Sequence, residues 1–140
     1  GYMLDDAEII VMSMGSIVGT IKDVVDEYRA KGEKIGVLKV RSFRPFPKEQ
    51  ICKAVKNAHA VVVLDKNISI GTNEGALFTE TKSCLYNSKV RIPVIGYTVG
   101  HGGRDIRVES IAKVIEETKK AAKSGITVES QFMDLKEELL

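Results

Sequence analysis

The chain of 140 residues has a formal net charge of +2, and 44% of its residues are hydrophobic and 29% charged. A chain of this length forms one domain whose core needs no disulfide or metal. The composition argues against a disordered chain, and the alternation of basic and acidic residues argues against a nucleic-acid binder. No apolar run is long enough to span a bilayer and no secretion signal opens the chain, so we expect a cytoplasmic protein without a membrane partner.

Two further features concern the state of the cysteines and the start of the chain. Cys52 and Cys84 have no second cysteine or histidine at metal-ligand spacing, so we expect two reduced, buried thiols. The chain begins with Gly1 and Tyr2 instead of methionine, which indicates either an excised piece or a remnant of cloning.

The first half of the chain predicts a strand, a helix, a second strand and a second helix, at residues 8–14, 17–28, 35–40 and 47–58. Gly15 separates the first pair, and Gly32 suits a left-handed cap that ends the first helix. Pro45 and Pro47 exclude regular structure between the second strand and the second helix, and Pro47 suits the first turn of that helix.

The second half repeats the alternation, with elements expected at residues 61–64, 73–85, 91–98 and 108–122. Four consecutive apolar residues at 61–64 indicate a fully buried strand, and Gly71 and Gly75 allow the backbone to turn sharply after it. Pro93 lies within the strand expected at residues 91–98 and favours an edge or near-terminal position of that strand in the sheet. Gly125 ends the last helix, and residues 126–140 are expected to form a short amphipathic helix.

This alternation predicts a three-layer α/β/α fold with a mainly parallel sheet of strand order 2-1-3-4. The first and third strands then meet at the switch point, so the loops at 14–19 and 66–75 face one crevice. The loops that carry Arg44 and Arg104 lie to either side of it. We divide the chain into a domain over residues 1–125 and a tail over residues 126–140, which packs on this domain or on a partner.

The crevice edge carries the candidate interface residues, which are Arg44, Pro45, Phe46, Asp65, Asn67, Ser69, Gly71, Arg104 and Asp105. Arg44 lies on a proline-stiffened loop, which suits recognition of a carboxylate or of another chain, and the alternative is a solvated charge. Asp105 either caps the last helix or pairs with Arg104. The polar residues after the third strand either contact a partner or satisfy the backbone of their own turn.

No catalytic, cofactor-binding or metal-binding set is visible in the sequence. The turn at residues 15–19 lacks the three-glycine spacing of a dinucleotide fingerprint, and the turn at residues 100–103 has no following Lys-Ser or Lys-Thr. His101 has no nucleophile or ligand near it in sequence, and His59 is expected to cap carbonyls at a helix end.

Four segments taken together resemble the carboxyl-terminal part of the alpha subunit of pyruvate:ferredoxin oxidoreductase, also called pyruvate synthase, and they lie at residues 42–47, 63–71, 75–80 and 100–106. The resemblance runs from about residue 8 to residue 115. It implies a domain similar to the carboxyl-terminal domain of transketolase, with one antiparallel edge strand that either precedes Gly1 or is formed by the first residues.

The resemblance also implies the activity of the parent enzyme. Such enzymes decarboxylate pyruvate on thiamine diphosphate, join the acetyl unit to coenzyme A and pass electrons through iron–sulfur clusters to ferredoxin. None of these cofactors is expected in this stretch. The expected partners are the other domains of the alpha subunit, the other subunits and, for the whole complex, ferredoxin.

Three functional hypotheses remain open from the sequence. The first is an assembly module of a 2-oxoacid oxidoreductase without turnover of its own. The second is an anion-binding domain that holds part of coenzyme A or a nucleotide with Arg44, Arg104 and loop amides. The third is a complete small enzyme, which requires His101 and Asp65 in one closed pocket.

Overall fold

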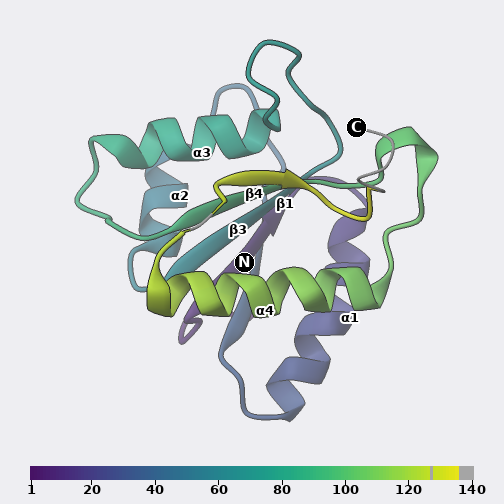
Figure 1. The fold of residues 1–140 in the computed structure, drawn as a ribbon. Helices are drawn as coiled ribbons and strands as arrows, with labels where there is room; N and C mark the ends of the chain where they lie inside the picture. The colour runs from purple at the N-terminus through teal and green to yellow at the C-terminus, as the bar shows by residue number, and fades with distance from the viewer. Residues whose placement is uncertain (127, 136–140) are drawn as a thin grey trace.

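The computed structural model describes residues 1–126 and 128–135, in which five strands alternate with helices (Figure 1). The strands are β1 Ile9–Ser13, β2 Ile35–Lys39, β3 Ala60–Asp65, β4 Val94–Thr98 and β5 Ser130–Phe132. The helices are α1 Ile17–Ala30, α2 Lys48–Val55, α3 Ala76–Tyr86 and α4 Val108–Ser124, with a short 3-10 turn, η1, at His101–Gly103. None of the described helices is long and apolar enough to cross a membrane.

The strands form one sheet in the order β2-β1-β3-β4-β5, and every neighbouring pair is parallel. In the register, Ile9 of β1 lies opposite Ile35 of β2 and Ala60 of β3. The predicted order of the first four strands is therefore confirmed. Pro93 directly precedes β4 instead of lying within it, and its carbonyl accepts a hydrogen bond from the N–H of Val61. Strand β4 is next to the last strand of the sheet, which is the near-terminal position that Pro93 favoured.

The fifth strand corrects the prediction of a helix in the tail. Residues 130–132 pair with β4, and Met133 follows them into the core with 7% of its surface exposed. Without β5 the backbone groups on the outer edge of β4 would be unpaired. Pairing with β4 therefore outweighs the weak helical pattern of the tail sequence. Leu135 is partly buried and lies outside any helix, whereas Leu139 lies outside the described residues.

The antiparallel element that the family resemblance implied is reduced to one bridge at the opposite edge. Tyr2 and Val37 exchange two backbone hydrogen bonds, of 2.9 and 2.8 Å, in antiparallel orientation. The first residues of the chain therefore cover part of the β2 edge. This agrees with the expectation that the first residues form the antiparallel edge element.

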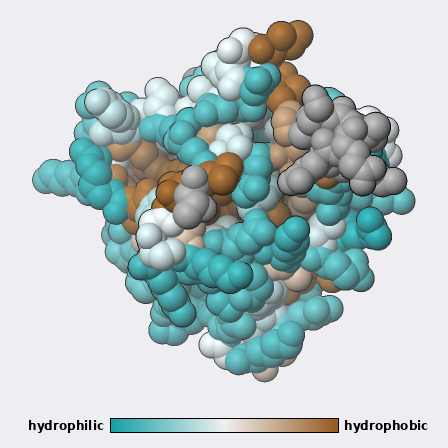
Figure 2. Space-filling view, viewed as in Figure 1, coloured by the Kyte–Doolittle hydropathy of each residue, from teal (hydrophilic) through white to brown (hydrophobic). Residues whose placement is uncertain are grey.

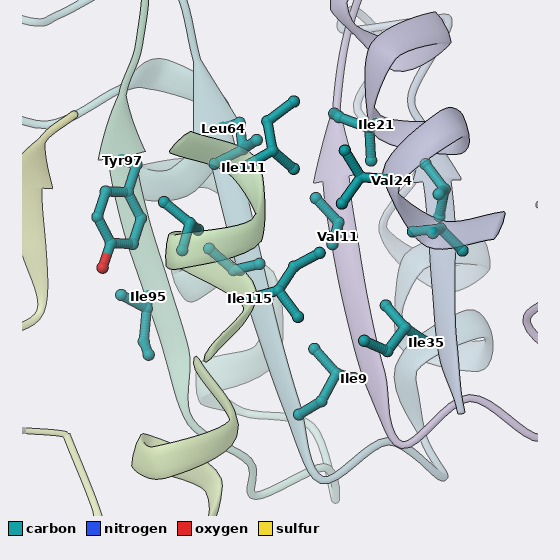
Figure 3. Close-up of a cluster of buried hydrophobic side chains, with 14 of the residues drawn as sticks. Ile9, Val11, Ile21, Val24, Ile35, Leu64, Ile95, Tyr97, Ile111 and Ile115 are labelled. Atoms are coloured by element: carbon teal, nitrogen blue, oxygen red, sulfur yellow. The ribbon is translucent and has the colours of Figure 1, made fainter. Parts of the chain in front are cut away.

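Helices cover both faces of the sheet. Helices α1 and α4 pack on one face, where Ile21, Val24, Ile111 and Ile115 point toward the sheet residues around Val11 (Figure 3). Helices α2 and α3 pack on the other face around a second apolar cluster that includes Ile51 and Phe78. The sheet is thus the middle of three layers, and its carboxyl edge leaves four loops free to form a site.

Candidate functional site

The carboxyl edge of the sheet is hollowed at the switch point between β1 and β3. A cavity of about 440 Å³ lies there, and its lining comes from the start of α1, from Lys66 and from the loop after β4. The residues that line it are Ser16, Ile17, Thr20, Lys66, Gly100, Gly103, Arg104, Asp105 and Ile106. The structure therefore brings the loops after β1, β3 and β4 together, and Arg104 and Asp105 line the hollow instead of flanking it.

Arg104 and Asp105 do not pair with one another. The Arg104 guanidinium donates a hydrogen bond to the backbone carbonyl of Asp134, which ties the η1 loop to the segment after β5. The prediction that Asp105 caps α4 is wrong, because Arg107 holds the N-cap position and, among the described residues, no backbone N–H of α4 donates to the Asp105 carboxylate. Asp105 is exposed at the rim of the hollow.

The side chain of Asp65, at the end of β3, caps the amino terminus of α3, whose N-cap position is held by Gly75. Its carboxylate accepts hydrogen bonds from the backbone N–H groups of Phe78, at 2.9 Å, and Leu77, at 3.3 Å. Asn67 joins the cap, since its side-chain carbonyl accepts the N–H of Ala76 at 2.9 Å while its amide donates to Asp65 at 3.3 Å. Asp65 and Asn67 therefore satisfy backbone groups of their own chain, and this structural role describes them better than contact with a partner does.

Burial raises the pKa of the Asp65 carboxyl, whose residue is 5% exposed. The N–H groups of Phe78 and Leu77 and the amide of Asn67 favour the charged form and oppose that rise in pKa. The hydrogen bonds from the start of α3 thus offset part of the cost of burying the Asp65 carboxylate.

Ser69 and Gly71 belong to a closed loop that projects from the sheet edge. The Ser69 N–H donates to the Glu74 carbonyl at 2.8 Å, and the Asn73 N–H donates to the Ser69 carbonyl at 2.8 Å. Gly71 is exposed at the outer turn of this loop, and an added Cβ there would meet no atom within 4 Å. Both residues remain accessible to a partner.

The loop after β2 packs on α3 and does not line the hollow. The Arg44 guanidinium forms an ion pair of 2.6 Å with Glu80 and lies 4.2 Å from the centre of the Phe43 ring. Pro45 follows Arg44 through a cis peptide bond, and Phe46 meets Phe43 edge to face with ring centres 5.8 Å apart. Arg44 thus already binds a carboxylate of its own chain, although 62% of its side chain is exposed.

The two histidines are surface residues. His101 is exposed and lies edge to face against Phe132 at 5.8 Å, and His59 lies 3.8 Å from the Glu8 carboxylate, so the expected carbonyl cap is not observed. Neither His101 nor Asp65 lines the switch-point hollow. The structure therefore gives no support to the hypothesis of a complete small enzyme.

Two polar networks were missed by sequence reasoning. Lys82 of α3 bonds Glu74 at 2.8 Å and Glu129 at 3.2 Å, which joins the loop after β3 to the approach of β5. The Tyr97 hydroxyl donates to Glu117, and the Gln131 amide donates to that hydroxyl. Both networks include a residue of the tail, Glu129 or Gln131, so the incorrect helix prediction for the tail concealed these contacts.

The described residues offer no cluster of three or more His, Cys, Asp or Glu side chains that could hold a metal ion. The whole chain contains two cysteines, Cys52 and Cys84, whereas an iron–sulfur cluster takes four thiolates or their equivalents. The Cys52 thiol donates to the Cys84 carbonyl at 3.7 Å, and burial raises the pKa of Cys84 to about 12. These side chains do not fit a cluster site.

The fold and the site define a doubly wound α/β domain with a polar hollow at its switch point. Residues 7–111 match the family model of pyruvate:ferredoxin oxidoreductase core domain II, and the chain belongs to this family. The resemblance seen in four sequence segments is therefore confirmed.

Curated relatives agree with this family. The chain is 93% identical to the pyruvate synthase subunit PorA of Methanosarcina barkeri over 140 residues, which is 100% of this chain and 35% of the relative. It is 46% identical over 125 residues to the ketoisovalerate oxidoreductase subunit VorA of Pyrococcus furiosus, covering 89% of this chain and 31% of that subunit. The chain thus spans about a third of the length of the curated relatives that it matches.

Solved structures support the fold. A split-gene transketolase, described as an inactive beta4 tetramer, superposes with a TM-score of 0.63 at 16% identity, covering 92% of this chain and 41% of that one. The 2-oxoglutarate:ferredoxin oxidoreductase of Magnetococcus marinus, with 2-oxoglutarate, coenzyme A and succinyl-CoA bound, superposes at 0.61 with 18% identity, covering 81% of this chain and 18% of that one. The expected likeness to transketolase is confirmed at the level of the fold.

Proposed function

We propose that this chain is a domain of the alpha subunit of a pyruvate:ferredoxin oxidoreductase. The parent enzyme would convert pyruvate, coenzyme A and oxidised ferredoxin into acetyl-CoA, carbon dioxide and reduced ferredoxin. The observation that carries the proposal is the 93% identity to a pyruvate synthase subunit over the whole chain. The other subunits and domains would supply the thiamine diphosphate and iron–sulfur sites.

Within that enzyme the domain would serve assembly and contribute no catalytic group. The carboxylate of Asp65 is committed to capping α3, and the Arg44 guanidinium is paired with Glu80. Arg104 and Asp105 at the hollow, together with the exposed loop around Gly71, would contact the neighbouring domains or subunits. Loops held on a rigid sheet edge suit such contacts because little order is lost on binding.

The test uses the full-length subunit expressed together with its partner subunits. Pyruvate- and coenzyme A-dependent reduction of ferredoxin is expected, with lower activity on 2-oxoisovalerate and 2-oxoglutarate. The variants Arg104→Ala and Asp105→Asn are expected to lower the yield of assembled complex while kcat per assembled complex stays unchanged. Absence of 2-oxoacid oxidation would refute the parent function. A fall in kcat in a fully assembled variant would refute the assembly role.

A second candidate is the binding of an anionic part of coenzyme A or of a nucleotide in the switch-point hollow. It is favoured by the two cations, Lys66 and Arg104, that line the hollow beside the start of α1. Arg44 would take no part, because it lies outside the lining. Calorimetry with coenzyme A, thiamine diphosphate and NAD, on the assembled complex and on its Lys66→Met variant, separates the two candidates. Saturable binding that is lost in the variant supports the hollow as a ligand site.

We also propose the division into a domain at residues 1–125 and a tail at residues 126–140. Strand β5 and the buried Met133 indicate that the described part of the tail packs on this domain. The proposed location is the cytoplasm, since Cys52 and Cys84 are both free thiols, as in a reducing compartment.

A further inference from the structure

The loop between β3 and α3 presents the most exposed large apolar side chain among the described residues. Ile70 is 95% exposed, compared with 79% for Tyr86 and 50% for Val128. The loop stands away from the body of the molecule at the top of Figure 1, and Figure 2 shows apolar atoms at the same extremity. A single exposed apolar residue is ordinary on a protein surface. Whether Ile70 can serve as a binding residue therefore depends on how rigidly its loop is held.

Hydrogen bonds at its neck hold the loop in the form that exposes Ile70. The backbone bonds between Ser69, Asn73 and Glu74 close the loop across its neck. The Glu74 carboxylate is fixed in turn by Lys82 at 2.8 Å and by the Thr79 hydroxyl at 3.1 Å. A side chain on a pre-formed loop loses little conformational entropy when it binds, which is the property of a good anchor.

The tip of the loop has a defined chemistry. Residues 69–73 are Ser, Ile, Gly, Thr and Asn, none of them charged. The nearest charges in sequence are Lys66 and Glu74, and Glu74 is already paired with Lys82. The matching surface is therefore an apolar recess with an uncharged, hydrogen-bonding rim, which is found on a folded protein and not on a nucleic acid or an anionic lipid surface.

We propose that Ile70 is a docking anchor that inserts into an apolar recess on another domain of the same alpha subunit. The inference rests on the proposed function, because it requires the chain to be part of a longer subunit. The PorA relative is about three times as long as this chain, which covers 35% of it. Domains joined in one chain meet at high effective concentration, so a single anchor suffices where a freely diffusing partner would need a large interface.

The test measures hydrogen exchange of the loop amides at residues 68–74 in the full-length subunit within its complex. Wild-type amides are expected to be protected, and Ile70→Asp is expected to speed their exchange about tenfold or more, as loss of an interface anchor does. Tyr86→Asp is the matched control, since it places the same charge at another exposed apolar site, and exchange of the loop is expected to stay at the wild-type rate. Ile70→Leu is expected to restore protection.

Three results would overturn the proposal. The first is a wild-type loop that exchanges freely, and the second is equal behaviour of Ile70→Asp and Tyr86→Asp. The third is loss of a separate subunit from the Ile70→Asp complex while the alpha subunit keeps its protection, because the recess would then belong to another chain. Pyruvate-dependent ferredoxin reduction by the wild-type complex is measured in parallel. If that activity is present and the anchor test is negative, the anchor fails and the proposed function stands.

Discussion

Asp65 occupies the space that a side chain at Gly75 would need. A Cβ added to Gly75 would lie 2.2 Å from Oδ2 and 2.3 Å from Cβ of Asp65. Gly75 has an extended backbone, with φ of −68°, so the glycine is required for space and not for a left-handed turn. The last residue of the central strand and the first residue before α3 are therefore fitted to one another.

Gly75→Ala is expected to destabilise the domain by about 1 to 3 kcal/mol, because either Asp65 or the start of α3 must move. Urea unfolding measures the change in the free energy of unfolding. Gly71→Ala is the matched control, since an added Cβ there meets no atom within 4 Å, and a change near zero is expected. Equal effects of the two variants would contradict the steric role of Gly75.

Asp65→Asn is expected to change the dependence of stability on pH. Burial raises the pKa of Asp65 above its ordinary value of 3.8, so the folded state holds its proton more tightly than the unfolded state does. The resulting stabilisation is present below the unfolded pKa and is lost as pH rises through the folded pKa. Unfolding measured between about pH 4 and about pH 7 should therefore show wild type losing stability relative to Asp65→Asn as pH rises. Parallel curves would contradict the raised pKa.

Lys82→Met is expected to cost about 1 kcal/mol, because it leaves the carboxylates of Glu74 and Glu129 without their shared cation. Burial lowers the pKa of Lys82, but the hydrogen bonds to Glu74 and Glu129 prevail and raise it. Lys113→Met on the exposed side of α4 serves as the control, with little change expected. A loss no larger than the control's would show that the bridge is not stabilising.

The Arg44 and Glu80 pair is expected to contribute little to stability. Its side chains are 62% and 33% exposed, and exposed ion pairs give coupling energies of about 0.2 to 1 kcal/mol. A double-mutant cycle of Arg44→Met and Glu80→Gln, followed by chemical unfolding, measures the coupling. A much larger value would mean that the pair holds the proline loop against α3.

Met133→Ala is expected to destabilise the domain by about 2 kcal/mol or more, since Met133 is 7% exposed and packs in the core beside β4. Thermal or chemical unfolding of the chain provides the measurement. Substitution of the exposed Val128 by Ala is expected to have a small effect. If both changes were neutral, the tail would not belong to the cooperative unit.

The alternation of elements could be predicted because apolar spacing at residues 17–28 and the continuous run at 61–64 are strong local signals. Strand β5 could not, because three residues carry too short an alternation to distinguish a strand from a helix. Its pairing is imposed by the otherwise open edge of β4, which is a property of the folded sheet.

The site was predictable in place but not in detail. A parallel sheet fixes the edge at which loops gather, so Lys66 was expected to face the crevice and Arg104 to flank it, and both line it. The partners of Asp65 were not predictable, because its bonds to Leu77 and Phe78 cross the whole intervening loop. The start of α3 at Ala76 instead of near residue 73 follows from the same cap.

The position of β5 has a consequence for biosynthesis. The strand that shields β4 is separated from it by all of α4, so a ribosome releases β4 well before its outer neighbour exists. During that interval the newly made sheet exposes a row of unpaired backbone groups to other nascent chains. Slowing translation within α4 should therefore favour misassembly of this protein in the cell.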